Sequence, residues 1–332
     1  MVSIKDIARA AHVSHSTVSR ALRDSPLVNA ETRDLIRKIA NEKGYRVSAV
    51  ARSLVTRRTN TLGVVVTSIA DPFVGEVVGG VEEFAVARDY SVILATCHGD
   101  PDRELRAVRS LQERRVDGVL VAASRVGALY MPMLEELGTP LVLINNQYPG
   151  EFGFHVSIDN PAGARQITTH LLDLGHRRIA YIGDRFGLHS DTERCDGYRE
   201  SLRGAGIPYA AELVASGDGG SESALTAMRQ LLDLPDPPTA VFCYNDMQAF
   251  GALRAARERG LRVPADISIA GFDDLFFSSY TDPPLTTIRQ PKKEMGCDAA
   301  EILLELLAGH TPRSVVKQGA LVVRQSTAAR RS

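Results

Sequence analysis

The sequence contains no tryptophan and only four cysteines in 332 residues, Cys97, Cys195, Cys243 and Cys297. They are far apart and form no CxxC pair, so each is predicted to be a buried thiol in a reducing compartment. No apolar run approaches the roughly 18 residues that span a bilayer. Charged residues interrupt the first fourteen residues, where a signal peptide needs an apolar core. We therefore expect a cytoplasmic protein that has no membrane partner.

The chain has almost no net charge, with a formal value of -1, but its basic and acidic residues are unevenly distributed along the sequence. Residues 1–60 hold 12 Lys and Arg against 5 Asp and Glu, which leaves 27 against 35 in the remainder. A basic N-terminal segment on an acidic body indicates a polyanionic partner for that segment. The length favours two or three domains, each with its own core.

Two short helices are predicted near the N-terminus, with Ser3 and Ser14 in position to cap them. In the second, Val18, Ala21 and Leu22 share one face and must point inward. The opposite face displays short hydrogen-bonding side chains and one guanidinium, which are His15, Ser16, Thr17, Ser19 and Arg20. A guanidinium there could bind the acceptor edge of a guanine.

A third helix is expected to begin at Asn29 or shortly after and to end at Gly44. Its inward face is predicted to carry Leu35, Ile36, Ile39 and Ala40. Three helices in about 45 residues indicate a helix-turn-helix unit whose second helix enters the major groove. Residues 47–60 follow as a basic segment, which the residue pattern alone does not distinguish from a simple linker.

From Thr61 onward, short Val/Ile/Leu-rich runs alternate with longer amphipathic stretches. The runs are "TLGVVVTS", "YSVILATC", "DGVLVAAS", "PLVLINN", "RIAYIGD", "TAVFCYND" and "DISIAGFDD". Such alternation predicts βαβ units and buried parallel sheets. The first four runs and "HVSID" would form one lobe, the later runs a second, and "GALVVRQST" a closing strand.

Polar residues directly follow several of these runs, where ligands collect in open parallel sheets. Asp71, Asn145, Asn146, Asn245, Asp246 and Asp273 are in such positions. An aspartate after a strand is also a common helix cap, so either role is open for each. Together with Arg194 on a following helix, these groups suit a ligand rich in hydroxyls.

"IKDIARAAHVSHSTVSRAL" and "NAETRDLIRKIANEKGYRVSAVARSL" resemble the DNA-binding head and hinge helix of the lactose repressor (LacI-type) family of bacterial transcription regulators. The resemblance extends over nearly the whole chain. It implies a small all-α helix-turn-helix head plus a hinge helix, joined to an α/β periplasmic-binding-protein-like body of two lobes with parallel sheets. The implied domains are the head at 1–46, the hinge helix and linker at 47–60, the first lobe at 61–158 with about 289–316, and the second at 159–288 with about 317–332.

The resemblance also implies which residues contact DNA. His15, Ser16 and Arg20 correspond to the family's base-reading positions, and "ARSL" places the leucine that wedges into the minor groove at Leu54. Such a wedge kinks the duplex, at a cost of a few kcal/mol per base step. The remaining expected DNA-binding residues are Thr17, Ser19, Asn29, Ser48, Ala51 and Arg52.

Effector contacts follow from the same resemblance. The segments "DTERCDGY", "CYND" and "AGFDD" imply contacts at Arg194, Asn245 and Asp273, and "ADPFVGE" adds Phe73 and Asp71. Ser190 and Gln290 fall near further effector positions. Some family members stack an aromatic ring on the ligand where this chain has Gly219, so a sugar or related polyol is expected rather than a flat heterocycle.

Enzymatic signatures are missing. The sequence has no GxGxxG turn, no P-loop and no G-x-S-x-G elbow. His170 and His176 have no cysteine or carboxylate at metal-binding spacing and are predicted to be structural. We therefore predict no catalytic residues, no metal and no cofactor. A sugar-processing α/β enzyme would need a catalytic constellation, and a solute-binding protein would have no basic helix-turn-helix head.

The sequence thus predicts a transcriptional repressor that is not an enzyme. It would bind palindromic double-stranded operator DNA as a homodimer, and in that state it would be associated with the nucleoid. A sugar or sugar derivative bound between the lobes would control operator affinity.

Overall fold

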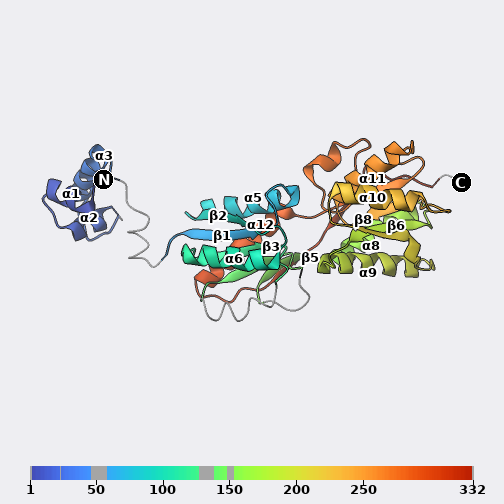
Figure 1. The fold of residues 1–332 in the computed structure, drawn as a ribbon. Helices are drawn as coiled ribbons and strands as arrows, with labels where there is room; N and C mark the ends of the chain where they lie inside the picture. The colour runs from blue at the N-terminus through green and yellow to red at the C-terminus, as the bar shows by residue number, and fades with distance from the viewer. Residues whose placement is uncertain (1, 23, 46–57, 127–137, 148–152, 331–332) are drawn as a thin grey trace. The chain divides into compact units, whose positions relative to one another are not determined.

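The computed structural model describes residues 2–22, 24–45, 58–126, 138–147 and 153–330, and they form two compact units (Figure 1). The first unit spans Met1–Thr59 and the second Asn60–Ser332. They are called here the head and the body.

The head contains α1 (Ile4–Ala10), α2 (His15–Ala21) and α3 (Ala30–Glu42). Ser14 caps α2, because its Oγ accepts a hydrogen bond from Thr17 N at 3.1 Å. α3 ends before Gly44, whose φ of +63° is the left-handed conformation that commonly ends helices. A single small core joins the three helices and consists of Ile7, Ala8, Ala11, Val18, Ala21, Val28, Ile36 and Ala40.

The prediction that Leu35 lies in the core of the head is wrong. Leu35 is 48% exposed, although Ile36 and Ala40 are buried as the helical pattern predicts. Ile39 is only partly buried. Three short helices enclose only a narrow core. The buried face of α3 is therefore narrower than the set of apolar residues on that side of the helix, and Leu35 lies outside it.

The first lobe of the body contains a six-stranded sheet in which every paired strand is parallel. In spatial order it contains β11 (Val315–Lys317), β5 (His155–Ile158), β4 (Leu141–Ile144), β3 (Gly118–Ala122), β1 (Thr61–Val66) and β2 (Ser91–Thr96). Helices α5 (Pro72–Val86) and α12 (Lys292–Leu307) share a core with one face. Helix α6 (Pro101–Glu113) shares a second core with the other.

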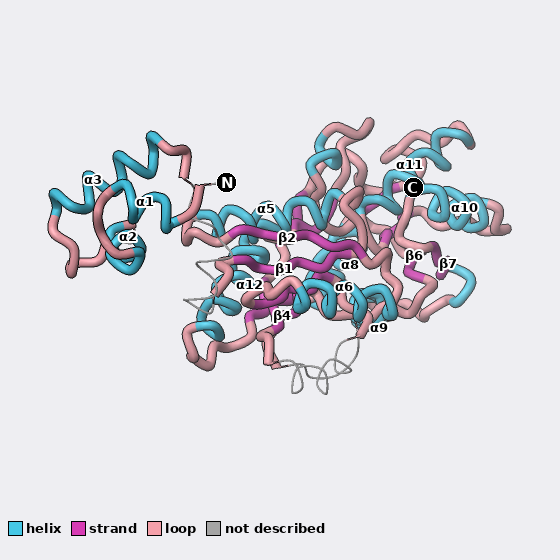
Figure 2. The backbone as a smooth tube through the Cα atoms, turned by 60° about the vertical axis from the view of Figure 1, so that its left-hand side comes forward, coloured by secondary structure: helices cyan, strands magenta, loops and turns pink. Residues whose placement is uncertain are grey.

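The second lobe repeats this layering around a four-stranded parallel sheet (Figure 2). Its order is β7 (Val214–Gly217), β6 (Ile179–Asp184), β8 (Ala240–Cys243) and β9 (Ser268–Ala270). Helices α8 (Asn160–Asp173) and α9 (His189–Gly204) cover one face, and α10 (Ser221–Leu232) and α11 (Asp246–Glu258) the other. Two 3-10 turns, η2 (Ala211–Leu213) and η3 (Phe276–Ser279), complete it.

The chain passes between the lobes three times. It leaves the first sheet after β5, returns to the first lobe at α12, and leaves again after β11. β10 (Thr287–Arg289) and β12 (Ala320–Val322), which flank these last two passages, pair antiparallel with each other. In the described part of the chain, no helix has the length and apolarity that a bilayer crossing requires.

Two histidines, the partly buried His170 and the buried His176, hold the C-terminal segment on the second lobe. His170 Nε2 lies 2.9 Å from Thr327 Oγ1, and His176 Nε2 lies 3.1 Å from Ala328 O. Burial lowers the pKa of both imidazoles, which favours their neutral forms. Both histidines therefore have structural roles here.

Candidate DNA-binding and effector sites

The outward face of α2 carries the predicted base-reading side chains. His15, Ser16 and Arg20 are exposed, whereas Thr17 and Ser19 are partly buried beside the core residue Val18. Ser14 Oγ lies 2.7 Å from Ser16 Oγ and 2.8 Å from Thr17 Oγ1, so these hydroxyls already form a local network at the start of α2.

Arg20 lies in the last turn of α2. Among the described residues of the head it has no ion-pair partner, and its guanidinium is open to solvent. Asp24 instead pairs with two arginines of α3, Arg33 and Arg37, with Arg37 Nη2 2.5 Å from its Oδ1. The acid nearest in sequence is therefore neutralised elsewhere, which leaves the charge of Arg20 available to a polyanion.

Asn29 is exposed and caps α3, with its Oδ1 accepting a hydrogen bond from Thr32 N at 2.8 Å. The structure thus gives Asn29 a role within the head and leaves its amide nitrogen as a donor. The predicted hinge residues Ser48, Ala51, Arg52 and Leu54 lie outside the described residues.

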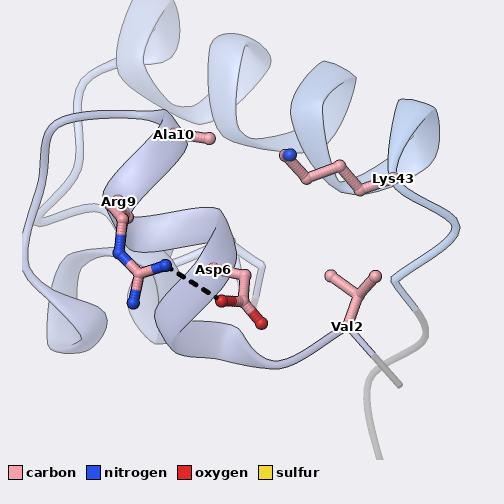
Figure 3. A pocket seen from close by; sticks show the side chains of 5 residues that line it. All are labelled: Val2, Asp6, Arg9, Ala10 and Lys43. Carbon is pink, nitrogen blue, oxygen red and sulfur yellow. Dashed lines mark hydrogen bonds and ion pairs between the residues drawn. The ribbon is translucent and has the colours of Figure 1, made fainter.

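A shallow depression of about 510 Å³ on the head lies between α1 and the end of α3 (Figure 3). Its lining residues are Val2, Asp6, Arg9, Ala10 and Lys43. The Asp6 carboxylate already accepts two hydrogen bonds from Ser3, and its Oδ1 lies 3.4 Å from Arg9 Nη1, with which it forms an ion pair. The depression contains none of the predicted DNA-binding residues, and its carboxylate serves the cap of α1.

In the body, Asp71 and Phe73 lie at the start of α5. Asp71 caps this helix, with its Oδ1 accepting from Phe73 N at 2.9 Å, so the helix-cap alternative is realised at this position. Phe73 packs against the first-lobe core and is partly buried. Asp71 is also partly buried, and burial raises the pKa of its carboxyl.

Arg194 projects from α9 into the second lobe and is only 3% exposed. Its Nε donates to Asn160 Oδ1 at 2.8 Å, and its Nη1 donates to the Tyr244 carbonyl at 2.6 Å. The guanidinium lies 3.7 Å from the centre of the Phe272 ring. These contacts fix the guanidinium plane, and no acceptor among the described residues binds Nη2.

Ser190, one turn before Arg194 on α9, connects the two lobes. Its Oγ donates to Gln147 Oε1 at 2.7 Å, and Gln147 follows β4 in the first lobe. Ser190 Oγ also lies 2.7 Å from the Tyr244 hydroxyl. A ligand that reached Ser190 would therefore compete with a contact between the lobes.

Asp273 and Gln290 contact each other where β9 and β10 end. Gln290 Nε2 donates to Asp273 Oδ1 at 2.7 Å, and both residues are buried. Gln290 is 2% exposed, yet its Oε1 has no hydrogen-bond partner among the described residues. The backbone of Asp273 has a φ of +124°, which is uncommon for a residue with a side chain.

Asn245 caps α11 through Gln248 N, which donates to its Oδ1 at 2.8 Å. Its Nδ2 donates to Gly219 O at 3.0 Å, so both ends of the amide are bonded within the second lobe. Gly219 has a φ of +85°, which disfavours any residue with a side chain. An aromatic ring at this position would therefore strain the backbone.

Carboxylates dominate the electrostatics of this region. Burial raises the pKa of Asp273, Arg194 opposes the rise, and the neighbouring Asp246 carboxyl adds to it. Burial also raises the pKa of Asp246, although Ser278 and Thr287 donate hydrogen bonds to it. The acceptor beside these carboxyls that has no partner among the described residues is Gln290 Oε1, and it favours a ligand that donates a hydrogen bond.

Several residues of this site are missed by the sequence predictions. Tyr244, Phe272 and Asn160 hold Arg194, and Gln147 binds Ser190 from the other lobe. Lys292 Nζ donates to the carbonyls of Asp273 and Asp274 and lies 3.4 Å from Glu76 of α5. Tyr244 lies within "CYND", Phe272 lies within "AGFDD" and Gln147 directly follows "PLVLINN", whereas no predicted segment pointed to Asn160 or Lys292.

The structure thus brings Ser190, Arg194, Asp273 and Gln290 into one buried polar cluster, which we call the effector cluster. Burial is the main cause of the raised pKa of Asp273, and Asp71 of the first lobe adds only a minor contribution to it. Asn245 and Phe73 are fixed by contacts within their own lobes.

A three-helix head with an exposed polar helix, followed by a two-lobed body with a buried polar cluster at the strand ends, defines a ligand-controlled DNA-binding regulator. Residues 3–48 match the family described as "Bacterial regulatory proteins, lacI family" and residues 168–327 a "Periplasmic binding protein-like domain". The chain belongs to the lacI family of bacterial regulatory proteins.

Individual relatives cover nearly the whole chain. It is 37% identical over 308 residues to the HTH-type transcriptional repressor CytR of Escherichia coli (strain K12), covering 92% of this chain and 90% of CytR. The lac repressor dimer bound to operator and the anti-inducer ONPF is 29% identical, with a TM-score of 0.90 and 99% of both chains covered. A complex of the regulator CelR with cellobiose is 35% identical, with a TM-score of 0.74, covering 98% of this chain and 100% of CelR.

These comparisons confirm the predicted family, the predicted fold class and the prediction that the protein is a DNA-binding regulator rather than an enzyme. The assignments of individual site residues and of domain boundaries stay predictions.

Proposed function

We propose that this protein is a repressor that binds a palindromic operator as a homodimer and whose operator affinity is controlled by a sugar or sugar derivative bound between the lobes. The main support is that one chain contains both the exposed α2 face and the effector cluster. Each has side chains that are held in place but retain unused hydrogen-bonding groups.

The DNA-binding side chains in this proposal are those predicted from the sequence. Arg20 would contact a guanine with two hydrogen bonds, and His15 and Ser16 would contact neighbouring base edges. Thr17, Ser19 and Asn29 would fix the head against phosphates, and Ser48, Ala51, Arg52 and Leu54 would occupy the minor groove.

The effector class follows from which hydrogen-bonding groups are unused. Gln290 Oε1 and Asn145 Oδ1 are buried acceptors without partners among the described residues. An unsatisfied buried polar atom costs about 1–3 kcal/mol, so a ligand that donates to it gains that amount. Adjacent hydroxyls of a polyol supply such donors, and the relative CelR is seen in complex with cellobiose.

The residues proposed to contact the effector are Asp71, Phe73, Ser190, Arg194, Asn245, Asp273 and Gln290. Arg194 Nη2 and the Asp273 carboxyl would bind opposite ends of a vicinal hydroxyl pair. Phe73 would supply an apolar wall at the start of α5. No aromatic platform is available at Gly219, which favours a sugar over a flat ring.

Coupling between effector and DNA would act through contacts that join the lobes. Gln147 binds Ser190 across the lobes, and Lys292 Nζ links the Asp273 carbonyl to Glu76 of α5. An effector that altered these contacts would favour one arrangement of the lobes. A preference of about 1–3 kcal/mol changes operator affinity by roughly 5- to 150-fold.

Exposed apolar groups on both lobes support the homodimer. Three rings cluster at η3, where Phe276, Phe277 and Tyr280 are 65%, 55% and 73% exposed. The edge strand β2 exposes Ile93 and Leu94 in the first lobe. Clustered exposed rings like the three at η3 mark protein interfaces. As a chromosomal DNA-binding protein it would act in the cytoplasm, associated with the nucleoid.

The test is selection of bound fragments from the source genome by the purified protein at 150 mM salt, followed by a panel of sugars. Enrichment of one palindrome, and a change in its binding with one sugar of the panel, are the expected results. If no sequence is enriched either with or without the sugars, the proposed function is wrong.

A further inference from the structure

Helix α6 of the first lobe has one buried carboxylate, that of Glu104, which is only 1% exposed. The other buried residues of this helix are apolar. A buried carboxylate is costly unless it accepts hydrogen bonds, and Glu104 accepts them from residues 123–126, which we call the β3 turn. Its Oε1 accepts from Ser124 Oγ at 2.5 Å, and its Oε2 accepts from Arg125 N at 3.1 Å. Glu104 therefore fixes the β3 turn to α6.

The β3 turn needs such support, because its backbone is strained where it begins. Ala123, the first residue after β3, has a φ of +55°, which is a left-handed conformation that alanine seldom adopts. The bonds to Glu104 hold the two residues that follow Ala123. Val126 N also donates to Ser124 Oγ at 3.2 Å, so the hydroxyl that binds Glu104 also fixes the end of the turn.

The β3 turn is connected to the second lobe through Arg125 and through Gln147. The guanidinium of Arg125 lies 5.0 Å from the centre of the Phe186 ring, which belongs to the second lobe. The Ser124 carbonyl accepts from Gln147 N at 2.8 Å, and Gln147 Nε2 donates to Asn145 O at 2.9 Å. These two bonds orient the Gln147 side chain and leave its Oε1 for the second lobe.

Gln147 caps a helix of the other lobe. Helices α5, α6, α8 and α11 are each capped by an Asp or Asn of their own, whereas Leu188, at the N-cap of α9, has no side-chain acceptor. Gln147 Oε1 accepts instead from Ser190 N at 3.2 Å and from Ser190 Oγ at 2.7 Å, and the Gln147 carbonyl accepts from His189 N at 3.4 Å. Backbone N–H groups in the first turn of a helix have no partner within the helix. The first lobe therefore satisfies two of those in α9.

We propose that Glu104 is a positioning residue for this cap between the lobes. Its carboxylate holds the β3 turn, the turn holds Gln147, and Gln147 holds the start of α9. Because α9 carries both Ser190 and Arg194, Glu104 acts on the effector cluster from α6. An effector that binds Ser190 competes with Gln147, so the strength of the cap sets the effector concentration that is needed. This last step rests on the proposed function.

The experiment measures amide hydrogen exchange in the full-length protein without DNA or sugar. Glu104→Gln keeps the size of the side chain but has one acceptor oxygen instead of two, so it cannot keep the bonds to both Ser124 and Arg125. Exchange in the first turn of α9 should then be about 2- to 10-fold faster than in wild type, because loss of one hydrogen bond favours the open form by about that factor. Unchanged exchange there would overturn the proposal. If Glu104→Gln does not fold, Ser124→Ala, which removes one of the two bonds, is measured with the same expectation.

A double-mutant comparison shows whether Glu104 acts through Gln147. Gln147→Ala removes the side-chain acceptor and should by itself speed exchange in the first turn of α9. Adding Glu104→Gln to this variant should change the exchange no further, because no side-chain cap remains to be positioned. An additive effect of the two substitutions would show that Glu104 acts by another route, which contradicts the proposal.

Two control variants on α6 separate positioning from stability. Glu113→Gln removes a charge from an exposed position of the same helix and should leave exchange at the wild-type rate. Val108→Ala opens a cavity beside the first-lobe sheet but leaves the β3 turn bonded, so exchange should rise in the first lobe and not in α9. Equal acceleration in α9 by Val108→Ala and Glu104→Gln would mean that the stability of the lobe decides, and the positioning role would be wrong.

Sugar titrations of operator binding extend the test to the effector. The panel begins with cellobiose, the sugar in the CelR complex. For each sugar that acts on wild type, the half-effective concentration should be about 2- to 10-fold lower for Glu104→Gln, because a weaker cap competes less. An equal or higher concentration would contradict competition at Ser190. If no sugar acts, the proposed function fails, whereas the exchange rates still decide whether Glu104 positions the cap.

Discussion

Two arginines of this chain occupy opposite environments, and their environments define what each can do. Arg20 is exposed on α2, whereas Arg194 is buried and held by Asn160, the Tyr244 carbonyl and the Phe272 ring. An exposed guanidinium can reach a base edge and adapt to it. A buried one is preorganised, so a ligand loses little conformational entropy on binding it.

Substitution of Arg20 tests base reading. Arg20→Gln should weaken operator binding by about 1–3 kcal/mol, which is roughly 5- to 150-fold, because the bidentate contact to guanine is lost. Arg20→Lys keeps the charge but not the fork, so it should lose much of the same specificity while binding random duplex like wild type. Competition titrations at fixed salt measure both. Equal operator affinity for Lys and Arg would contradict a bidentate contact.

The buried carboxyl of Asp273 predicts a pH dependence of stability. Burial raises the pKa of Asp273 to about 8, so the folded body holds a proton that the unfolded chain releases near pH 4. The contribution of Asp273 to the free energy of unfolding is fully present below about pH 4. It is lost as pH rises toward 8, by up to about 1.4 kcal/mol per pH unit.

Denaturant unfolding of wild-type protein between pH 5 and 9 should therefore show stability falling as pH rises. Asp273→Asn should flatten the profile, because the amide keeps an oxygen to accept from Gln290 but does not titrate. Asp246, whose pKa burial also raises, would leave a smaller residual slope. A wild-type profile parallel to that of the variant would show that Asp273 is already ionised.

At the scale of elements, α5 and α12 pack closely through glycines. A Cβ on Gly80 would lie 2.0 Å from the Lys293 carbonyl, and one on Gly296 would lie 2.1 Å from the Val77 carbonyl. The two helices therefore approach backbone to backbone. This contact holds α12, which follows the second passage between the lobes, on the first lobe.

Neighbouring glycines of α5 offer a matched test of this packing. Gly80→Ala should destabilise the body by about 1–3 kcal/mol, because α12 must move to admit the methyl group. Gly79→Ala meets nothing within 4 Å and should stabilise by about 0.5–1 kcal/mol, since alanine favours the helix. Denaturant midpoints measure both, and a neutral Gly80→Ala would show that α12 adapts.

At the scale of the whole molecule, assembly depends on surface that a single chain leaves uncovered. The η3 rings contact one another, with Phe276 and Tyr280 centroids 5.0 Å apart, but they remain exposed. Burial of such rings contributes about 25 cal/mol per Å² of apolar area. A second copy of the chain is the proposed partner.

Phe277→Asp/Tyr280→Asp should therefore convert the dimer to a monomer, because a charge in an apolar interface must be desolvated. Operator affinity should fall with it, since one protomer contacts one half of a palindrome. Val323→Asp, an exposed apolar position on the same lobe, should stay dimeric. Sedimentation of the three proteins gives the result, and a dimeric double variant would place the interface elsewhere.

The sequence by itself determined the classes of element and the family. Helical spacing in the head and alternation of buried runs with amphipathic stretches in the body depend on local periodicity, which neighbouring residues specify. Caps at Ser14, Asn29 and Asp71 are likewise local, because a capping side chain bonds a nitrogen two or three residues away.

Only the tertiary structure decided which polar groups meet and which apolar groups stay exposed. Gln147 reaches Ser190 across 43 residues and Gln290 reaches Asp273 across 17, and no local pattern encodes such pairs. Leu35 is exposed for the same reason: the width of the head's core depends on how three helices pack, which the periodicity of one helix does not contain.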